Sequence, residues 1–227
     1  MKYGKRPAVR PPRLATASAY AVGRLPAAPT SVAAPQLSWG MDLNDTLGDC
    51  TIAGVAHLLL AWNTDRGAKA VQPPTDDEVR RTYFALTGGP DSGLVEFDVL
   101  KAWYHTGLFG HECLGFAPVE RTIPDLCETI ATFGGVYLGI ACPASAQQDF
   151  AAHRPWTWEP DSPTDGGHCI VGVGYTPTAM LCVSWGQLVE VTWPFLAHYL
   201  DEAWAVIGPE FAGAVDLPSL RRDLALV

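Results

Sequence analysis

The chain has 227 residues, of which 48% are hydrophobic and 17% charged, and its formal net charge is −9. That length allows one large domain or two closely packed lobes with a sizeable core. Six basic residues and no acidic residue precede Asp42, whereas the remainder has nine basic against 24 acidic residues. An acidic body argues against nucleic acid as the main partner. We expect the basic N-terminal stretch to lie on the chain's own acidic surface rather than on an acidic partner.

Neither export nor membrane insertion is predicted. No run approaches the roughly 18 apolar residues of a membrane span, and the basic leader lacks a continuous apolar segment. The six cysteines lack the clustered spacing of a disulfide framework, and no Cys-x-x-Cys pair indicates zinc. His105, His111 and Cys113 lack a partner pattern for a metal and are interpreted as structural. We expect a cytoplasmic protein with reduced cysteines and no metal or cofactor, and its oligomeric state is left open.

Residues 1–38 are rich in Pro, Ala and Arg and are expected to form little regular structure. We predict a short arm packed across the body, with apolar anchors at Leu14, Tyr20, Val22 and Leu25. A helical inhibitory propeptide is less favoured, because the stretch is so rich in proline. Whether the arm is removed is left open.

Residues 44–57 are the stretch around which the rest of the chain is organised. A Gly48-Asp49 turn delivers Cys50 to the start of an apolar helix that continues to Trp62. Asp49 is a good N-cap, and the positive helix end favours a thiolate over a thiol. The helix is apolar almost all round, which indicates burial. Cys50 is therefore a candidate nucleophile, and a small core residue is the alternative.

The following segments complete the prediction in chain order. Helices are expected at 75–86, where Thr75 to Glu78 form a capping box, and at 97–105. Beyond them we expect extended segments over 108–119, a helix at 122–133, a strand at 136–140, a helix ending near 150, strands at 170–175, 180–183 and 188–192, a helix at 193–202 and a strand at 204–207.

His168 is the candidate partner of Cys50. It follows the Gly-rich approach from Asp165 to Gly167 and precedes an apolar run ending at Tyr175. A thiol nucleophile needs an imidazole that takes its proton and returns it to the leaving group. Asp165 is interpreted as a turn residue rather than a helper of the histidine.

These blocks resemble the papain-like cysteine peptidases. That family has an amide side chain six residues before the cysteine, a glycine two before it, Gly-Tyr after the histidine strand, and a later Ser-Trp-Gly. The matching residues are Asn44, Gly48, Gly174, Tyr175, Ser184, Trp185 and Gly186. The resemblance implies an α+β fold with a catalytic domain over 39–227, in which a helical lobe (about 39–107) faces an antiparallel β-rich lobe (about 108–227) across a cleft.

The resemblance also implies roles for single residues. Cys50 would be the nucleophile and His168 the base and acid, while Asn44 and the Cys50 amide would hold the oxyanion. Trp185 would shelter the residue that orients the histidine. Two further residues are expected at the binding site, Gly167 and Asp49.

One departure from the family concerns the orienting residue. The family has an asparagine directly before Ser-Trp-Gly, where this chain has Val183. Ser184 is the nearest substitute for orienting His168, and Gln187 and Glu190 are weaker candidates. Loss of the orienter is expected to weaken a Cys-His pair rather than abolish it.

Three other residues have two interpretations each. His57 lies two helical turns beyond Cys50, about 10 Å away at 1.5 Å per residue, so it is expected in the core or at a subsite. Trp156 and Trp158 either wall a cleft before His168 or serve as packing residues.

The sequence thus predicts a thiol hydrolase that cleaves peptide or amide bonds of a peptide or protein through an acyl-enzyme. Two alternatives remain: a non-catalytic papain-like binding or structural protein, and a Cys-His acyltransferase or amidase acting on a small molecule.

Overall fold

A central antiparallel sheet organises the computed structural model, which describes residues 1–11, 13–23, 27–63 and 72–227. Within these residues the sheet has six strands in the order β1-β6-β2-β3-β4-β5. The strands are β1 (Gly115–Pro118), β2 (Val136–Pro143), β3 (Thr164–Tyr175), β4 (Ala179–Ser184), β5 (Gln187–Thr192) and β6 (Leu200–Ile207).

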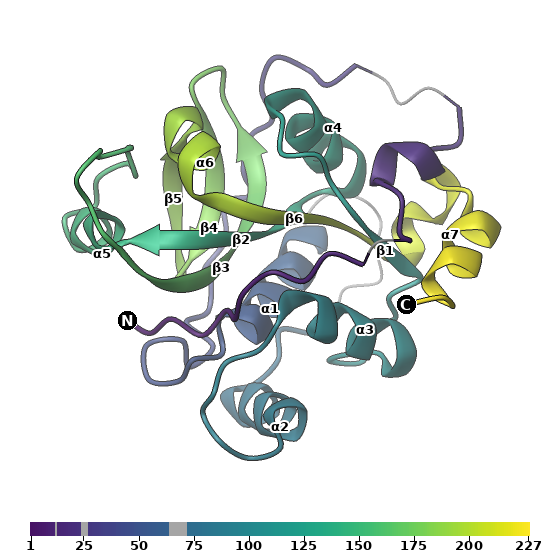
Figure 1. Ribbon diagram of the computed structural model, residues 1–227, viewed down its shortest axis with the longest axis horizontal. Coiled ribbons are helices and arrows are strands. Elements are labelled where there is room, and N and C mark those ends of the chain that lie inside the picture. Colours follow the sequence, from purple (N-terminus) through teal and green to yellow (C-terminus); the bar gives the residue numbers. More distant parts are fainter. Residues whose placement is uncertain (12, 24–26, 64–71) are drawn as a thin grey trace.

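Helices cover both sides of this sheet. They are α1 (Cys50–Trp62), α2 (Asp76–Thr87), α3 (Glu96–Thr106), α4 (Ile123–Phe133), α5 (Ala144–Ala151), α6 (Trp193–Tyr199) and α7 (Leu217–Leu224), with 3-10 turns η1 (Ala17–Tyr20) and η2 (Pro209–Ala214). In Figure 1, α1, α2 and α3 lie below β2 and β3, and α4 and α6 lie above them. The mixture of helices with an antiparallel sheet agrees with the predicted α+β class.

Local signals set several helix ends. The predicted capping box is present, because the Thr75 side chain accepts from the Glu78 amide while the Glu78 carboxylate accepts from the Thr75 amide. Gly88 and Gly134 end α2 and α4 in the left-handed conformation that glycine adopts without strain. Every residue of α1 except Leu60 is buried, as its apolar sequence predicts.

Three predicted boundaries were wrong. The helix predicted to reach residue 202 ends at Tyr199, because Leu200 and Glu202 pair with Ile140 and Gly139 of β2. Strand β3 begins at Thr164, so His168 lies inside the strand rather than at its start. Of the extended region 108–119, only β1 is a strand, and it pairs with β6.

The N-terminal arm crosses the molecule between the sheet and the helices below it (Figure 1). Leu14 and Tyr20 are buried anchors as predicted, and the Tyr20 hydroxyl donates to Asp223 at 2.7 Å. Val22 was wrongly predicted as an anchor, since it is 60% exposed. Leu25 lies outside the described residues.

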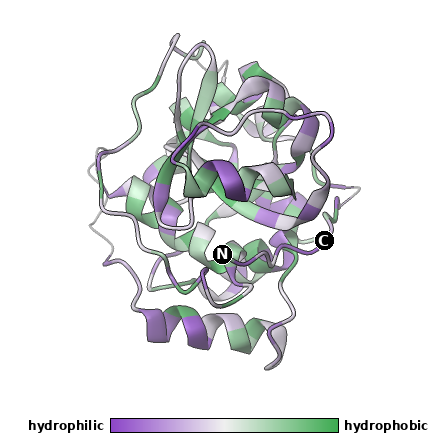
Figure 2. Ribbon diagram, turned by 90° about the vertical axis from the view of Figure 1, so that its left-hand side faces the viewer, coloured by the Kyte–Doolittle hydropathy of each residue, from purple (hydrophilic) through white to green (hydrophobic). Residues whose placement is uncertain are grey.

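The apolar residues gather in the centre of the molecule. Figure 2 shows this in the green segments of the central elements, whereas α2, the lowest helix, alternates hydrophilic and hydrophobic residues. Among the described residues, no helix is both long enough and apolar enough to cross a membrane.

Candidate active site

Cys50 is the first residue of α1 and lies against strand β3. Its side chain is buried, and its sulfur accepts a hydrogen bond from the Cys169 amide at 3.4 Å. Because Cys169 directly follows His168, this contact places the Cys50 sulfur next to the main chain of the candidate base, while His168 Nδ1 makes no hydrogen bond to that sulfur. The two residues are 118 positions apart in the sequence, and the packing of α1 on β3 brings them to one place.

The β4–β5 hairpin holds the histidine. Ser184 pairs with Gln187 across a two-residue turn in which Trp185 and Gly186 have φ of 44° and 71°. Positive φ at both positions is the pattern of a type I′ turn, whose twist matches that of the strands. The Ser184 hydroxyl lies 2.9 Å from His168 Nε2, and the Trp185 ring stacks on the imidazole with centroids 4.3 Å apart. Ser184 therefore stands where the sequence placed a substitute orienter.

The other imidazole nitrogen has no hydrogen-bond partner. His168 Nδ1 is buried and unpartnered within the described part of the chain. With Nε2 engaged by Ser184, Nδ1 is the position at which this histidine can accept a proton. Beneath the indole, Trp156 is fully buried and packs on Trp185 at 5.7 Å, whereas Trp158 is 45% exposed. Trp156 thus supports the hairpin as a packing residue.

Burial keeps the Cys-His pair neutral in this arrangement. It raises the pKa of Cys50 to about 12, and the amide hydrogens of Cys169 and Gly4 oppose this only in part. Burial also lowers the pKa of His168 to about 3, and the charge of His57 adds to that effect. The thiolate expected from the helix end alone is therefore not the favoured form here, because the cost of burying a charge exceeds the effect of the helix end.

The loop before α1 differs from its expected geometry. Asp49 stands at the N-cap, but its side chain makes no capping bond; its Oδ1 accepts from Asn44 Nδ2 at 3.2 Å instead. The second bond from Asn44 Nδ2 goes to the Leu47 carbonyl, also at 3.2 Å. Asn44 therefore directs both amide hydrogens into its own loop rather than toward the place of an oxyanion. Burial raises the pKa of Asp49 to about 7.

The arm runs along a groove that adjoins Cys50 and His168, although neither of these residues lines it. This groove is lined by the arm itself, residues 1–6, together with Gly48, Asp91, Ser92, Gly93, Gln147, Asp165 and Gly167. The arm hydrogen-bonds to both of its walls. These bonds run from the Lys2 amide to Asn44 O (3.1 Å), from Trp185 Nε1 to Lys2 O (3.2 Å), from the Gly4 and Lys5 amides to Gly167 O (3.2 and 3.0 Å), from the Leu94 amide to Gly4 O (2.9 Å) and from the Arg6 amide to Leu94 O (2.9 Å).

Gly4 of the arm packs against the loop that leads into Cys50. Its amide donates to the Gly167 carbonyl oxygen at 3.2 Å and opposes the rise in the pKa of the Cys50 thiol. A Cβ on Gly4 would lie 1.7 Å from the Gly48 carbonyl oxygen, and one on Gly93 would lie 2.1 Å from the Gly4 carbonyl oxygen. Only glycine fits this path. The arm therefore lies tightly against the loop that precedes Cys50.

Sequence reasoning placed an arm across the body but missed that it fills the groove beside the site. The positive charge of the arm was the one sequence feature that indicated its position on the acidic body. In the structure Lys2 pairs with Asp91 and Lys5 with Asp201, each at 2.9 Å. Leu94, which pairs with Lys5 as an isolated β-bridge, carried no local signal. Tyr3 also packs edge-on against the His168 ring, at 5.9 Å.

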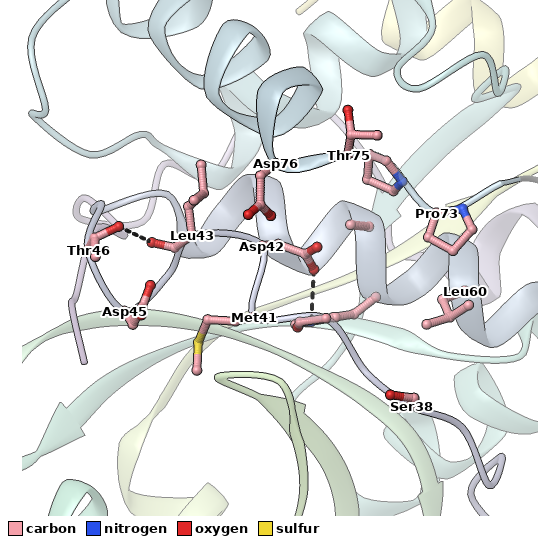
Figure 3. Close-up of a pocket in the computed structure, with 14 residues that line it drawn as sticks. Ser38, Met41, Asp42, Leu43, Asp45, Thr46, Leu60, Pro73, Thr75 and Asp76 are labelled. Atoms are coloured by element: carbon pink, nitrogen blue, oxygen red, sulfur yellow. Dashed lines mark hydrogen bonds and ion pairs between the residues drawn. The ribbon is translucent and has the colours of Figure 1, made fainter.

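A second pocket lies behind the loop that leads into α1 (Figure 3). Here His57 Nε2 lies 2.7 Å from the Gly40 carbonyl oxygen and 3.2 Å from an Asp42 carboxylate oxygen. Cys50 and His168 are not among the lining residues, so His57 belongs to a different cavity from the Cys-His pair.

Nothing in the described residues forms a metal centre. No group of three or more His, Cys, Asp or Glu side chains there is placed to hold a metal ion. His111 pairs instead with Glu210 at 2.9 Å, and the Cys113 thiol donates to the Gly115 carbonyl. All six cysteines are free and buried.

Known structures share this architecture. No protein-family model matches the chain, and no curated protein sequence matches it. Xylellain, a cysteine protease from Xylella fastidiosa, is similar with a TM-score of 0.69 and 14% identity, over 90% of this chain and 95% of its own. A cysteine protease from Carica candamarcensis is similar with a TM-score of 0.55 and 14% identity, over 78% of this chain and 98% of its own. The chain has the papain-like cysteine protease fold, which confirms the α+β prediction and the resemblance at the level of the fold.

Proposed function

We propose that this protein is a thiol hydrolase that cleaves peptide or amide bonds of a peptide or protein. The observation that carries the proposal is the position of Cys50 at the start of a buried helix, where its sulfur accepts from the amide of the residue after His168. His168 Nε2 in turn lies 2.9 Å from the Ser184 hydroxyl. A nucleophile, a base and an orienting group for the base in this order are the parts that acyl transfer requires. The cytoplasmic location stays a prediction.

The chemistry follows from the atoms at hand. His168 Nδ1 takes the thiol proton as the Cys50 sulfur bonds to the substrate carbonyl carbon. The oxyanion faces the first-turn amides of α1, which have no partner within the helix. His168 then gives its proton to the leaving amine as the C–N bond breaks. Water, activated by the same imidazole, hydrolyses the thioester and regenerates the thiol.

Two changes precede catalysis in this proposal. The arm leaves the groove, because Gly4 packs against Gly48 and Gly167, the residues that lead into Cys50 and His168. Water then enters, and the thiolate-imidazolium pair becomes accessible as the burial penalty falls. Asn44 contributes to the oxyanion hole only if its amide turns away from Asp49. Ser184 in place of a family asparagine keeps the imidazole ring oriented.

The test uses full-length protein carrying Gly4→Ala, which expels the arm by steric overlap. Hydrolysis of an unstructured protein such as casein is followed by the release of new amino termini. We expect cleavage by this variant and none by the same protein that also carries Cys50→Ala. Equal rates in the two proteins would refute the proposal.

The non-catalytic alternative has one observation in its favour, the replacement of the family asparagine by Val183. It predicts that the Gly4→Ala protein binds peptides without cleaving them. A transferase predicts that the acyl group passes to an added primary amine and that no acid is released, whereas the hydrolase releases the acid in water. The products therefore separate transfer from hydrolysis, and cleavage separates both from binding.

A further inference from the structure

Lys5 of the arm is a cation enclosed by the protein. Its side chain is 1% exposed, and its ammonium lies 2.9 Å from both Asp201 Oδ2 and Glu202 Oε1. The ammonium donates hydrogen bonds to Asp201 Oδ2 and, at 3.3 Å, to the Arg6 carbonyl, whereas its contact with Glu202 Oε1 is an ion pair without hydrogen-bond geometry. Three oxygen atoms thus surround the ammonium group. Burial by itself would lower the pKa of Lys5, but the carboxylates of Glu96 and Glu202 outweigh it and raise that pKa above its ordinary value.

The sheet forms the floor of this pocket. Gly139 of β2 pairs with Cys169 on one side and with Glu202 on the other, so the three residues form one row on the same face. Gly139, in the middle of this row, has no side chain, and the aliphatic part of the Lys5 side chain lies over it. A Cβ on Gly139 would be 2.0 Å from Lys5 Cε.

A bulge in β6 supplies the second carboxylate. Gly139 pairs with Glu202 and the next residue, Ile140, pairs with Leu200, so Asp201 is an extra residue in the strand. In a regular strand, Asp201 and Glu202 would point to opposite faces. The bulge lets both carboxylates reach the ammonium of Lys5.

A further acidic residue, Glu96, is buried near this pocket. Glu96, the first residue of α3, is fully buried, and neither of its oxygens has a hydrogen-bond partner of normal geometry among the described residues. Burial and then Glu202 raise its pKa well above the ordinary value, while Lys5 opposes them. Burial therefore favours the protonated form of Glu96, and the two carboxylates in contact with the ammonium are those of Asp201 and Glu202.

This pocket adjoins the candidate active site. Cys169 in its floor directly follows His168 and donates to the Cys50 sulfur, and Glu96 lies two residues after Leu94, which pairs with the arm. The residue that fills the pocket belongs to a segment held in the groove rather than to the sheet or helices. Its place can therefore be taken by another chain.

We propose that Asp201 and Glu202 form a specificity pocket for a lysine side chain of the substrate, and that Lys5 is its occupant while the arm is in place. The inference rests on the proposed function and deepens it by naming a substrate class: peptides with a lysine close to the cleaved bond. Lysine fits better than arginine, because single contacts to three oxygen atoms match an ammonium rather than a planar guanidinium.

Binding is tested first, without catalysis. Full-length protein carrying Gly4→Ala and Cys50→Ala is titrated into a fluorescein-labelled peptide of the arm sequence, residues 1–10, and into the same peptide with norleucine in place of Lys5. Fluorescence anisotropy should show binding of the lysine peptide and at least about tenfold weaker binding of the norleucine peptide. Adding Glu202→Gln should shrink this difference, and Lys5→Asp, which expels the arm by charge repulsion, replaces Gly4→Ala if that variant does not fold. Equal affinities for the two peptides would overturn the inference.

Hydrolysis separates the two proposals. Cleavage sites of the Gly4→Ala protein in a denatured protein mixture are read by mass spectrometry, and we expect lysine enriched at one fixed distance from the cleaved bond. Lysine-dependent binding without any cleavage would retain the pocket and refute the hydrolase. Cleavage without lysine enrichment, together with equal peptide affinities, would retain the hydrolase and refute the pocket.

Discussion

Displacing the arm should make Cys50 the most reactive thiol of the protein. Gly4→Ala adds a single methyl group, but that carbon would lie 1.7 Å from the Gly48 carbonyl oxygen and 2.2 Å from its carbonyl carbon. Both are backbone atoms of the loop that leads into α1, so they cannot move aside as a flexible side chain would. The arm must leave the groove, and water reaches the sulfur.

The size of the effect follows from the change in thiol ionisation. Burial raises the pKa of Cys50 to about 12 from an ordinary value of 9.0. At pH 8 the thiolate fraction would rise from about one part in ten thousand to about one part in ten, roughly a thousandfold. The Cys50 sulfur still accepts from the Cys169 amide, and strand β3 still covers one side of it, so its pKa does not return fully to the ordinary value. We therefore expect an increase in alkylation rate between about tenfold and a thousandfold.

The assay is pulse labelling with iodoacetamide at pH 8, followed by mass spectrometry of each cysteine peptide. The other five thiols are internal references, because they too are buried. Gly213→Ala is the matched control, since a Cβ at that position meets no atom within 4 Å. An unchanged Cys50 rate in Gly4→Ala would refute the reasoning, and a rise at all six thiols would indicate unfolding instead.

Three further outcomes are expected. Ser184→Ala in the arm-displaced protein should lower kcat/KM about two- to tenfold, the loss of one neutral hydrogen bond to His168, and an unchanged rate would exclude Ser184 as the orienter. Burial lowers the pKa of His168 from its ordinary value of 6.5 to about 3 in the folded protein. Between these two pH values His168 is therefore protonated in the unfolded chain but not in the folded one. As the pH falls below 6.5, the wild type should therefore lose stability relative to His168→Gln by about 1.4 kcal/mol per pH unit, measured by urea unfolding of both proteins. Trp185→Ala should cost about 3–5 kcal/mol in the same assay because the ring is fully buried, whereas Trp158→Ala, at an exposed site, should change stability by less than about 0.5 kcal/mol; equal losses would contradict the burial argument.

Local patterns in the sequence predicted many of the helices and strands of the fold. The apolar run after Cys50 predicted a buried helix, and the Thr75 capping box predicted the start of α2, because both depend on residues within a few positions of each other. The division at about residue 107 into a helical and a β-rich lobe stays a prediction. The end of α6 was missed, since the pairing of Leu200 with β2 overrides a local helical pattern there.

The sequence indicated which residues form the candidate site, but not that the arm covers it or that burial keeps Cys50 un-ionised. The sequence by itself determined a cysteine at a helix start, a histidine beyond a Gly-rich turn, and strands on either side of Ser184-Trp185-Gly186, because spacing and residue pattern are local. Only the tertiary structure decided that the arm fills the groove and that Lys5 meets Asp201, 196 residues away. It also decided the ionisation of Cys50: the helix end favours the thiolate, but burial under the arm costs more, and burial depends on how distant segments pack.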